Sequence, residues 1–139
     1  MSSYNGKVII SGEHSVVYGE LALAAPASLK VTASVVDQDW GEESELVRRA
    51  IELAGGDRTI HVRIESEIPI GAGLGSSAAV AAATISAVRI YLSKPTTQDE
   101  LFNLAFECER LSHGNPSGVD PAAVVYGGLI AYTKGKPEK

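Results

Sequence analysis

The chain has 139 residues, enough for one domain with a hydrophobic core. Its formal net charge is -5 and it has no basic block, which argues against nucleic acid as a partner, although local backbone donors can still bind a phosphorylated ligand. A single cysteine, Cys108, excludes an internal disulfide and a cysteine metal cluster. No stretch resembles a signal peptide or a membrane span, so a cytoplasmic protein without a membrane partner is expected.

The first quarter of the chain is expected to form a β-meander. Strands are predicted at residues 7–10, 21–27 and 29–36, with a short return at 15–18. Pro26 predicts a break or a β-bulge between two of them, because proline donates no hydrogen bond to a neighbouring strand.

Helices dominate the remainder. The expected elements are a helix at 43–54, a strand at 58–67, a helix at 76–92, a helix from the Thr97 cap to about 113, a short helix at 121–125, a strand at 129–133 and a polar tail at 134–139. Thr97 and Glu100 form a capping box, and the alanine-rich helix at 76–92 is expected to be mostly buried. Meander strands followed by mixed elements indicate an α+β fold.

A glycine-rich loop joins the strand ending at Pro69 to the alanine-rich helix. Gly71, Gly73 and Gly75 have no Cβ to keep an anion away, and two serines follow at the helix start, where unpaired N–H groups and the helix dipole favour negative charge. The loop lacks the lysine of a P-loop and the acidic residue of a Rossmann fingerprint. A phosphate site and a tight turn with a serine cap both remain open on this evidence.

Two further groups of residues are candidates for chemistry. Glu107, Glu109, His113 and Asp120 would suit metal-assisted phosphoryl transfer, with one carboxylate holding Mg²⁺ and another receiving or orienting a hydroxyl proton. The three carboxylates also have structural alternatives: Glu107 and Glu109 as solvated helix residues and Asp120 as a helix N-cap. The other group is Lys7, Glu13 and His14, where a surface cation and a structural histidine are the alternatives.

Three ordered segments resemble motifs of the GHMP kinases, in their mevalonate kinase form. They are NGKVIISGEHSVVYG at 5–19, PIGAGLGSSAA at 69–79 and ECERLSHGNPSGVD at 107–120. The run His-Gly-Asn-Pro-Ser-Gly-Val-Asp in the third favours that form over galactokinase, homoserine kinase or phosphomevalonate kinase. The resemblance implies an N-terminal domain at 1–139 that is like ribosomal protein S5 domain 2, with a mixed sheet packed against helices and a left-handed βαβ crossover.

The activity implied by the resemblance is ATP-dependent phosphorylation of the 5-hydroxyl of mevalonate to 5-phosphomevalonate, a step of isoprenoid biosynthesis and lipid metabolism, with ATP and Mg²⁺ as cofactors. Asp120 would be the base, Lys7 its charged partner, and Glu13 and His14 would form the mevalonate pocket. Ser77 and Glu109 would hold Mg²⁺. The ATP phosphates would be bound by Pro69, Ile70, Gly71, Ala72, Gly73, Leu74, Gly75, Ser76, Ser77, Ala78 and Ala79.

The chain departs from the family pattern in two ways. Asn5 stands where the family usually has proline. The family's C-terminal domain, with a third glycine-rich motif that closes the cleft, is expected to be absent, so the isolated chain should have little or no turnover. One alternative is a non-catalytic nucleotide-binding or assembly module that forms a homodimer or pairs with the missing domain on a second chain. Another is a GHMP kinase that acts on a different small alcohol.

Overall fold

The computed structural model describes residues 1–11, 21–41, 43–69, 75–113, 118–133 and 136–138. The elements are β1 (Ser2–Ser11), β2 (Ala22–Val36), α1 (Glu45–Leu53), β3 (His61–Ser66), α2 (Ser76–Tyr91), α3 (Gln98–His113), α4 (Val119–Tyr126), β4 (Ile130–Thr133) and β5 (Lys136–Glu138). This confirms the expected α+β class. No helix of the described ranges has the length and apolar character needed to cross a membrane.

One five-stranded sheet is organised around the long strand β2. β1 pairs along one edge of β2, while β3 and β4 share the other edge, β3 beside Val31–Val36 and β4 beside Ala22–Ala24. β5 extends the sheet beyond β4. All of these described pairs are antiparallel; β3 and β4 run in the same direction without a described pairing to each other. The left-handed crossover stays a prediction.

β2 is one continuous strand where two were expected. Pro26 lies within it, opposite Lys7, and the register of β1 against β2 shifts between Asn5 and Lys7. The expected bulge is therefore present, but it interrupts the pairing rather than the strand. The first strand was predicted too short, because β1 begins at Ser2, and β5 was missed, because it lies in the segment expected to be a polar tail. The predicted return at 15–18 lies outside the described residues.

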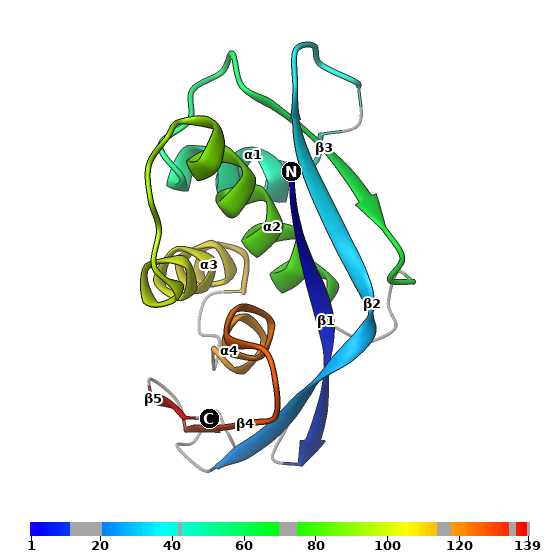
Figure 1. Ribbon diagram of the computed structural model, residues 1–139, viewed down its shortest axis with the longest axis vertical. Coiled ribbons are helices and arrows are strands. Elements are labelled where there is room, and N and C mark those ends of the chain that lie inside the picture. Colours follow the sequence, from blue (N-terminus) through cyan, green and yellow to red (C-terminus); the bar gives the residue numbers. More distant parts are fainter. Residues whose placement is uncertain (12–20, 42, 70–74, 114–117, 134–135, 139) are drawn as a thin grey trace.

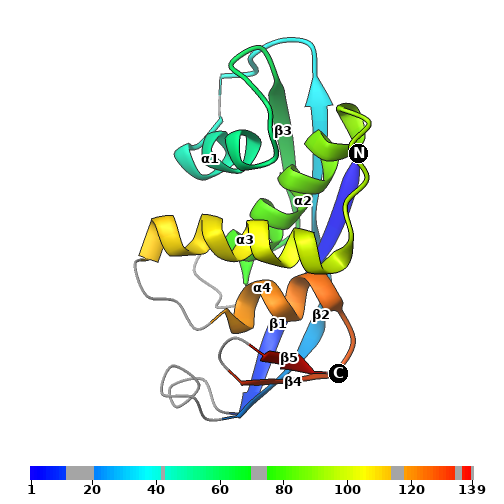
Figure 2. The same ribbon diagram turned by 90° about the vertical axis from the view of Figure 1, so that its left-hand side faces the viewer.

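The four helices cover one face of the sheet (Figure 1). Figure 2 shows α1, α2, α3 and α4 following one another along that face. α2 is the central helix, and nine of its residues are buried, as expected. They are Ala78, Ala79, Ala81, Ala82, Ala83, Thr84, Ile85, Ala87 and Val88. Because most of these side chains are small, the helix backbone lies close to the sheet and to the helices beside it.

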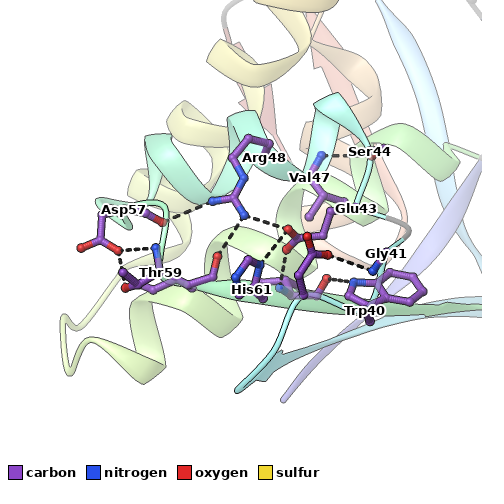
Figure 3. Close-up of polar contacts among 12 residues, drawn as sticks. Trp40, Gly41, Glu43, Ser44, Val47, Arg48, Asp57, Thr59 and His61 are labelled. Atoms are coloured by element: carbon purple, nitrogen blue, oxygen red, sulfur yellow. Dashed lines mark hydrogen bonds and ion pairs between the residues drawn. The ribbon is translucent and has the colours of Figure 1, made fainter.

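Glu43 ties the start of α1 to β3 (Figure 3). One carboxylate oxygen accepts from Arg48 at 2.8 Å and contacts His61 Nδ1 at 3.0 Å, and the other accepts from the Val62 backbone N–H at 2.7 Å. Burial raises the pKa of Glu43, but the hydrogen bonds from His61, Val62 and Arg48 outweigh it and leave that pKa below its ordinary value. The Glu43 cluster therefore has a structural role: it holds the start of α1 against β3, and Arg48 neutralises the carboxylate.

The starts of α3 and α4 differ in how they are capped. The Thr97 hydroxyl accepts from the Glu100 backbone N–H at 3.1 Å, so the predicted cap of α3 is confirmed. α4 begins at Val119, two residues earlier than expected, and its N-cap is Gly118. Asp120 therefore lies in the first turn of α4 and is not the cap, which frees its carboxylate for another partner.

Candidate active site

Lys7 is turned toward the helices by the irregularity in β1. Tyr4 packs against the core before the register shift and Ile9 packs against it afterwards, so the inward-facing positions change from even to odd residue numbers. Lys7 consequently points inward and is only 4% exposed. A buried lysine needs a partner for its charge, because desolvation of an unpaired ammonium is costly.

That partner is Asp120. Lys7 Nζ lies 3.0 Å from Asp120 Oδ1, with relative side-chain exposures of 5% and 32%. The pair joins β1 to the first turn of α4, two elements far apart in the sequence. Lys7 is enclosed and holds one side of the Asp120 carboxylate. Because Asp120 is partly exposed, the other side of the carboxylate is open to a ligand.

Gly118 fixes where α4 begins. Its φ of +88° lies in the left-handed region, and a Cβ at this position would lie 2.3 Å from Tyr132 Oη and 2.5 Å from Phe106 Cε2. Only glycine permits both the backbone conformation and this close packing. The contact sets the first turn of α4 against α3 and β4, and so determines the position of Asp120.

Glu109 on α3 belongs to the same electrostatic group. Burial, together with the negative charge of Asp120, raises the pKa of Glu109 to about 7, although Lys7 acts in the opposite direction. Its Oε2 atom is buried and has no hydrogen-bond partner among the described residues. Unsatisfied buried oxygens are uncommon in folded proteins and call for an explanation such as an ion or water. A carboxylate oxygen of this kind suits a hard divalent cation, which takes oxygen ligands.

The end of the glycine-rich loop meets Lys7. Gly75 is the N-cap of α2, with φ +74°, and a Cβ there would lie 2.7 Å from Lys7 Cγ. Gly75 has no side chain to cap the helix, Ser76 is half-buried and Ser77 is exposed. The N-terminus of α2 therefore lies against the aliphatic stem of the lysine whose ammonium holds Asp120. This end of the helix has the backbone donors and dipole that favour a phosphate.

The other predicted site residues lie in several places. Pro69 is exposed, whereas Ala78 and Ala79 are buried, so the alanine side chains pack into the core. Glu107 is separate from the cluster, because it forms an ion pair with Arg110 on the surface of α3. The remaining predicted site residues lie outside the described residues: Glu13, His14, Ile70, Gly71, Ala72, Gly73 and Leu74, as does the side chain of His113.

Three residues with supporting roles were not singled out from the sequence: Gly118, Phe106 and Tyr132. Gly118 was visible as part of a glycine-containing loop, but the close approach of the two aromatic side chains depends on tertiary packing. Tyr132 is fully buried, and the sequence indicated only that it belongs to the strand predicted at 129–133.

The comparisons with known proteins agree with the fold. Residues 27–128 match the family described as GHMP kinases N terminal domain. Mevalonate kinase of Thermococcus gammatolerans is 39% identical over 176 residues, covering 99% of this chain and 53% of that protein. The corresponding protein of Pyrococcus furiosus is 38% identical, with the same coverage. The chain thus spans about half the length of these curated relatives.

Solved structures of mevalonate kinases also match this chain over about half of their own length. The mevalonate kinase of Methanococcus jannaschii has a TM-score of 0.85 at 26% identity, covering 99% of this chain and 54% of that one. L. major mevalonate kinase, solved in complex with R-mevalonate, has a TM-score of 0.79 at 27% identity, covering 98% and 50%. The matched family covers most of the chain and the fold agrees over nearly all of it: the chain belongs to the GHMP kinase family and comprises its N-terminal domain.

Proposed function

We propose that this chain is the phosphate-binding and catalytic half of a mevalonate kinase, which transfers a phosphoryl group from ATP to the 5-hydroxyl of mevalonate. The observation that carries the proposal is the Lys7–Asp120 pair, with Nζ and Oδ1 3.0 Å apart, beside the N-termini of α2 and α4. The relatives named mevalonate kinase support the choice of substrate.

Asp120 would receive or orient the hydroxyl proton of the substrate. Its carboxylate is partly exposed and anchored on one side by Lys7, so a hydroxyl can approach the free side. Phosphoryl transfer depends largely on positioning of the attacking oxygen, and a fixed carboxylate in the first turn of a helix provides that.

Lys7 would stabilise negative charge in the transition state. Its ammonium holds Asp120, and its stem contacts Gly75 at the start of α2, so it lies between the two groups that meet during transfer. A buried cation in a site with little water interacts more strongly with the transferred phosphoryl group than an exposed one would.

Glu109 and Ser77 would hold Mg²⁺. Glu109 presents an oxygen without a partner, and Ser77 is exposed in the first turn of α2. When bound, Mg²⁺ would neutralise charge on the phosphate oxygens. Because the pKa of Glu109 is about 7, the side chain exchanges its proton for a cation near neutral pH at little cost.

The remaining predicted roles complete the proposal. The segment 69–79 would surround the ATP phosphates, with the N–H groups at the start of α2 as the donors that the structure describes. Glu13 and His14 would contact mevalonate. The second half of the relatives' length would close the site from another side, on this or another chain, so slow turnover is expected for these 139 residues alone.

A coupled ADP-release assay tests the proposal, with mevalonate, phosphomevalonate and galactose as acceptors in parallel. Mevalonate is expected to raise ADP release above the background of ATP hydrolysis, and Asp120→Asn should abolish that increase. Stimulation by galactose or phosphomevalonate alone would identify a different GHMP kinase. A rate typical of a complete enzyme would contradict the expectation that closure by a further domain is needed.

A non-catalytic assembly module is the second candidate, and exposed apolar residues favour it. Val8 on β1 is 44% exposed, and Leu129, which precedes β4, is 62% exposed. Val8 pairs with Ala25 on β2. The neighbouring residue Ala24 pairs with Ile130, the first residue of β4. An apolar row thus runs across β1 and β2 toward the residue that precedes β4. Light scattering at high concentration would support this candidate if it gave a stable dimer without any nucleotide binding.

A further inference from the structure

A pocket that contains two cationic side chains lies at the C-terminal end of α2. It has a volume of about 380 Å³ and is lined by Ser86, Arg89, Ile90, Ser93, Lys94, Pro95 and Thr96. We call it the Arg89 pocket. With 16 residues at 1.5 Å each, α2 places it about 24 Å from the helix N-terminus that faces Lys7 and Asp120. The Arg89 pocket is therefore separate from the proposed active site.

The two cations of this pocket have no acidic partner. Within the described residues, neither the Arg89 nor the Lys94 side chain takes part in an ion pair or hydrogen bond, and Arg89 Nε is buried without an acceptor. By contrast, Arg48, Arg49 and Arg110 each pair with a glutamate. A buried N–H donor without an acceptor is costly, and two neighbouring cations attract an anion.

The backbone at the helix end holds these groups together. The Lys94 N–H donates to the Arg89 carbonyl at 2.9 Å, and the Ser93 N–H donates to the Ile90 carbonyl at 3.0 Å, which is a Schellman motif. Ser93 has φ +57° and is the sole non-glycine residue with positive φ among those the structure describes. Glycine is the usual residue at this position, so serine retains a hydroxyl in the pocket at a conformational cost.

We propose that the Arg89 pocket binds a phosphate group, either free or carried by a small phosphorylated molecule. The guanidinium can donate two parallel hydrogen bonds to a tetrahedral oxyanion, while Lys94 supplies a second positive charge. The hydroxyls of Ser86 and Ser93 line the same space and can act as neutral donors, whereas the Thr96 hydroxyl already donates to the Lys94 carbonyl at 3.2 Å. The volume leaves room for a small organic group beyond the phosphate.

Another explanation is that both cations only complement helix dipoles. Arg89 is in the last turn of α2, and the Lys94 ammonium lies beside Gly55 after α1, where a Cβ would be 3.0 Å from it. A positive charge near a helix C-terminus is favourable without any ligand. This explanation predicts that removing either charge lowers stability and that phosphate does not bind.

NMR titration of the ¹⁵N-labelled chain with inorganic phosphate, at constant ionic strength, distinguishes a phosphate site from cations that only complement helix dipoles. Saturable shifts are expected at the amides of 86–96 and at the Arg89 Nε–H resonance, with a dissociation constant on the order of 1 mM. A parallel titration with glycerol 3-phosphate distinguishes free phosphate from a phosphomonoester by which of them saturates at lower concentration. Shifts confined to 75–79 would assign phosphate to the active site and overturn this proposal while leaving the proposed function intact.

Variants complete the test. Arg89→Gln and Lys94→Gln should each weaken phosphate binding at this pocket at least about tenfold, the loss expected for one charge-assisted hydrogen bond. Arg58→Gln removes the same charge from an exposed position outside the pocket and should leave the affinity unchanged. If the Arg89 variant fails to fold, Lys94→Gln still tests the contribution of a positive charge in the same pocket. Equal weakening by Arg58→Gln, or no saturation in the unmodified chain, would overturn the proposal.

Discussion

Replacing Glu109 by glutamine is expected to stabilise the folded chain while weakening the proposed binding of Mg²⁺. Burial and the nearby charge of Asp120 raise the pKa of Glu109 from the ordinary 4.5 to about 7. One pKa unit corresponds to about 1.4 kcal/mol, so a shift from 4.5 to about 7 means that the ionised carboxylate costs the folded state roughly 3–4 kcal/mol. Glutamine has nearly the same shape and carries no charge, so it removes this cost.

The stabilisation by Glu109→Gln is expected to depend on pH. Between about pH 4.5 and pH 7 the unfolded chain has released the Glu109 proton while the folded chain retains it, so stability falls as the pH rises through this window. Above pH 7 the full cost is present. The difference in unfolding free energy between Glu109→Gln and the unmodified chain should therefore be near zero at pH 4 and reach its maximum by pH 8.

Urea unfolding at pH 4, 6 and 8 in EDTA measures this difference, with fluorescence of Trp40 as the signal. Trp40 is the single tryptophan, and its indole N–H donates to the Val62 carbonyl at 2.8 Å in the folded state. Glu107→Gln on the same helix is the control; it breaks a surface pair with Arg110 and should give no stabilisation at pH 8. A Glu109 variant no more stable than the unmodified chain at pH 8 would refute the reasoning.

Three further predictions follow from packing. Gly118→Ala should cost about 2–4 kcal/mol, because it adds a steric clash to positive-φ strain, whereas Gly41→Ala has the strain without the clash and should cost about 1 kcal/mol; urea unfolding compares them. Ser93→Gly should raise stability by about 0.5–1 kcal/mol in the same assay, and a loss would contradict the helix-end analysis. Cys108 is buried and its pKa is raised to about 11, so Ellman's reagent should react only after unfolding.

Local patterns predicted the helices well. The Thr97 cap and the alanine-rich run set the start of α3 and the burial of α2, because both depend on residues close in sequence. Strand boundaries were less accurate. β2 continues through Pro26 because its pairing with β1 resumes beyond the register shift, which the local sequence around a proline does not reveal.

The candidate site likewise combines features that local sequence predicts with features that depend on tertiary contacts. The residue types at Lys7, Glu109 and Asp120 suggested phosphoryl-transfer chemistry, but sequence alone did not bring them together. Lys7 faces the helices only because the register shift changes which positions of β1 point inward. Asp120 reaches it only because Gly118 packs against the aromatic side chains of Phe106 and Tyr132. Both causes are tertiary contacts between segments far apart in the chain.

Single-turnover phosphoryl transfer tests the central claim most directly. The chain is mixed with a stoichiometric amount of ATP, excess mevalonate and Mg²⁺, and 5-phosphomevalonate is measured by mass spectrometry alongside nucleotide binding by calorimetry. The unmodified chain is expected to form the product slowly, while Asp120→Asn binds the nucleotide equally well and forms none. Equal product from both proteins at equal nucleotide occupancy would contradict the proposed assignment of Asp120 and Lys7 as its catalytic pair.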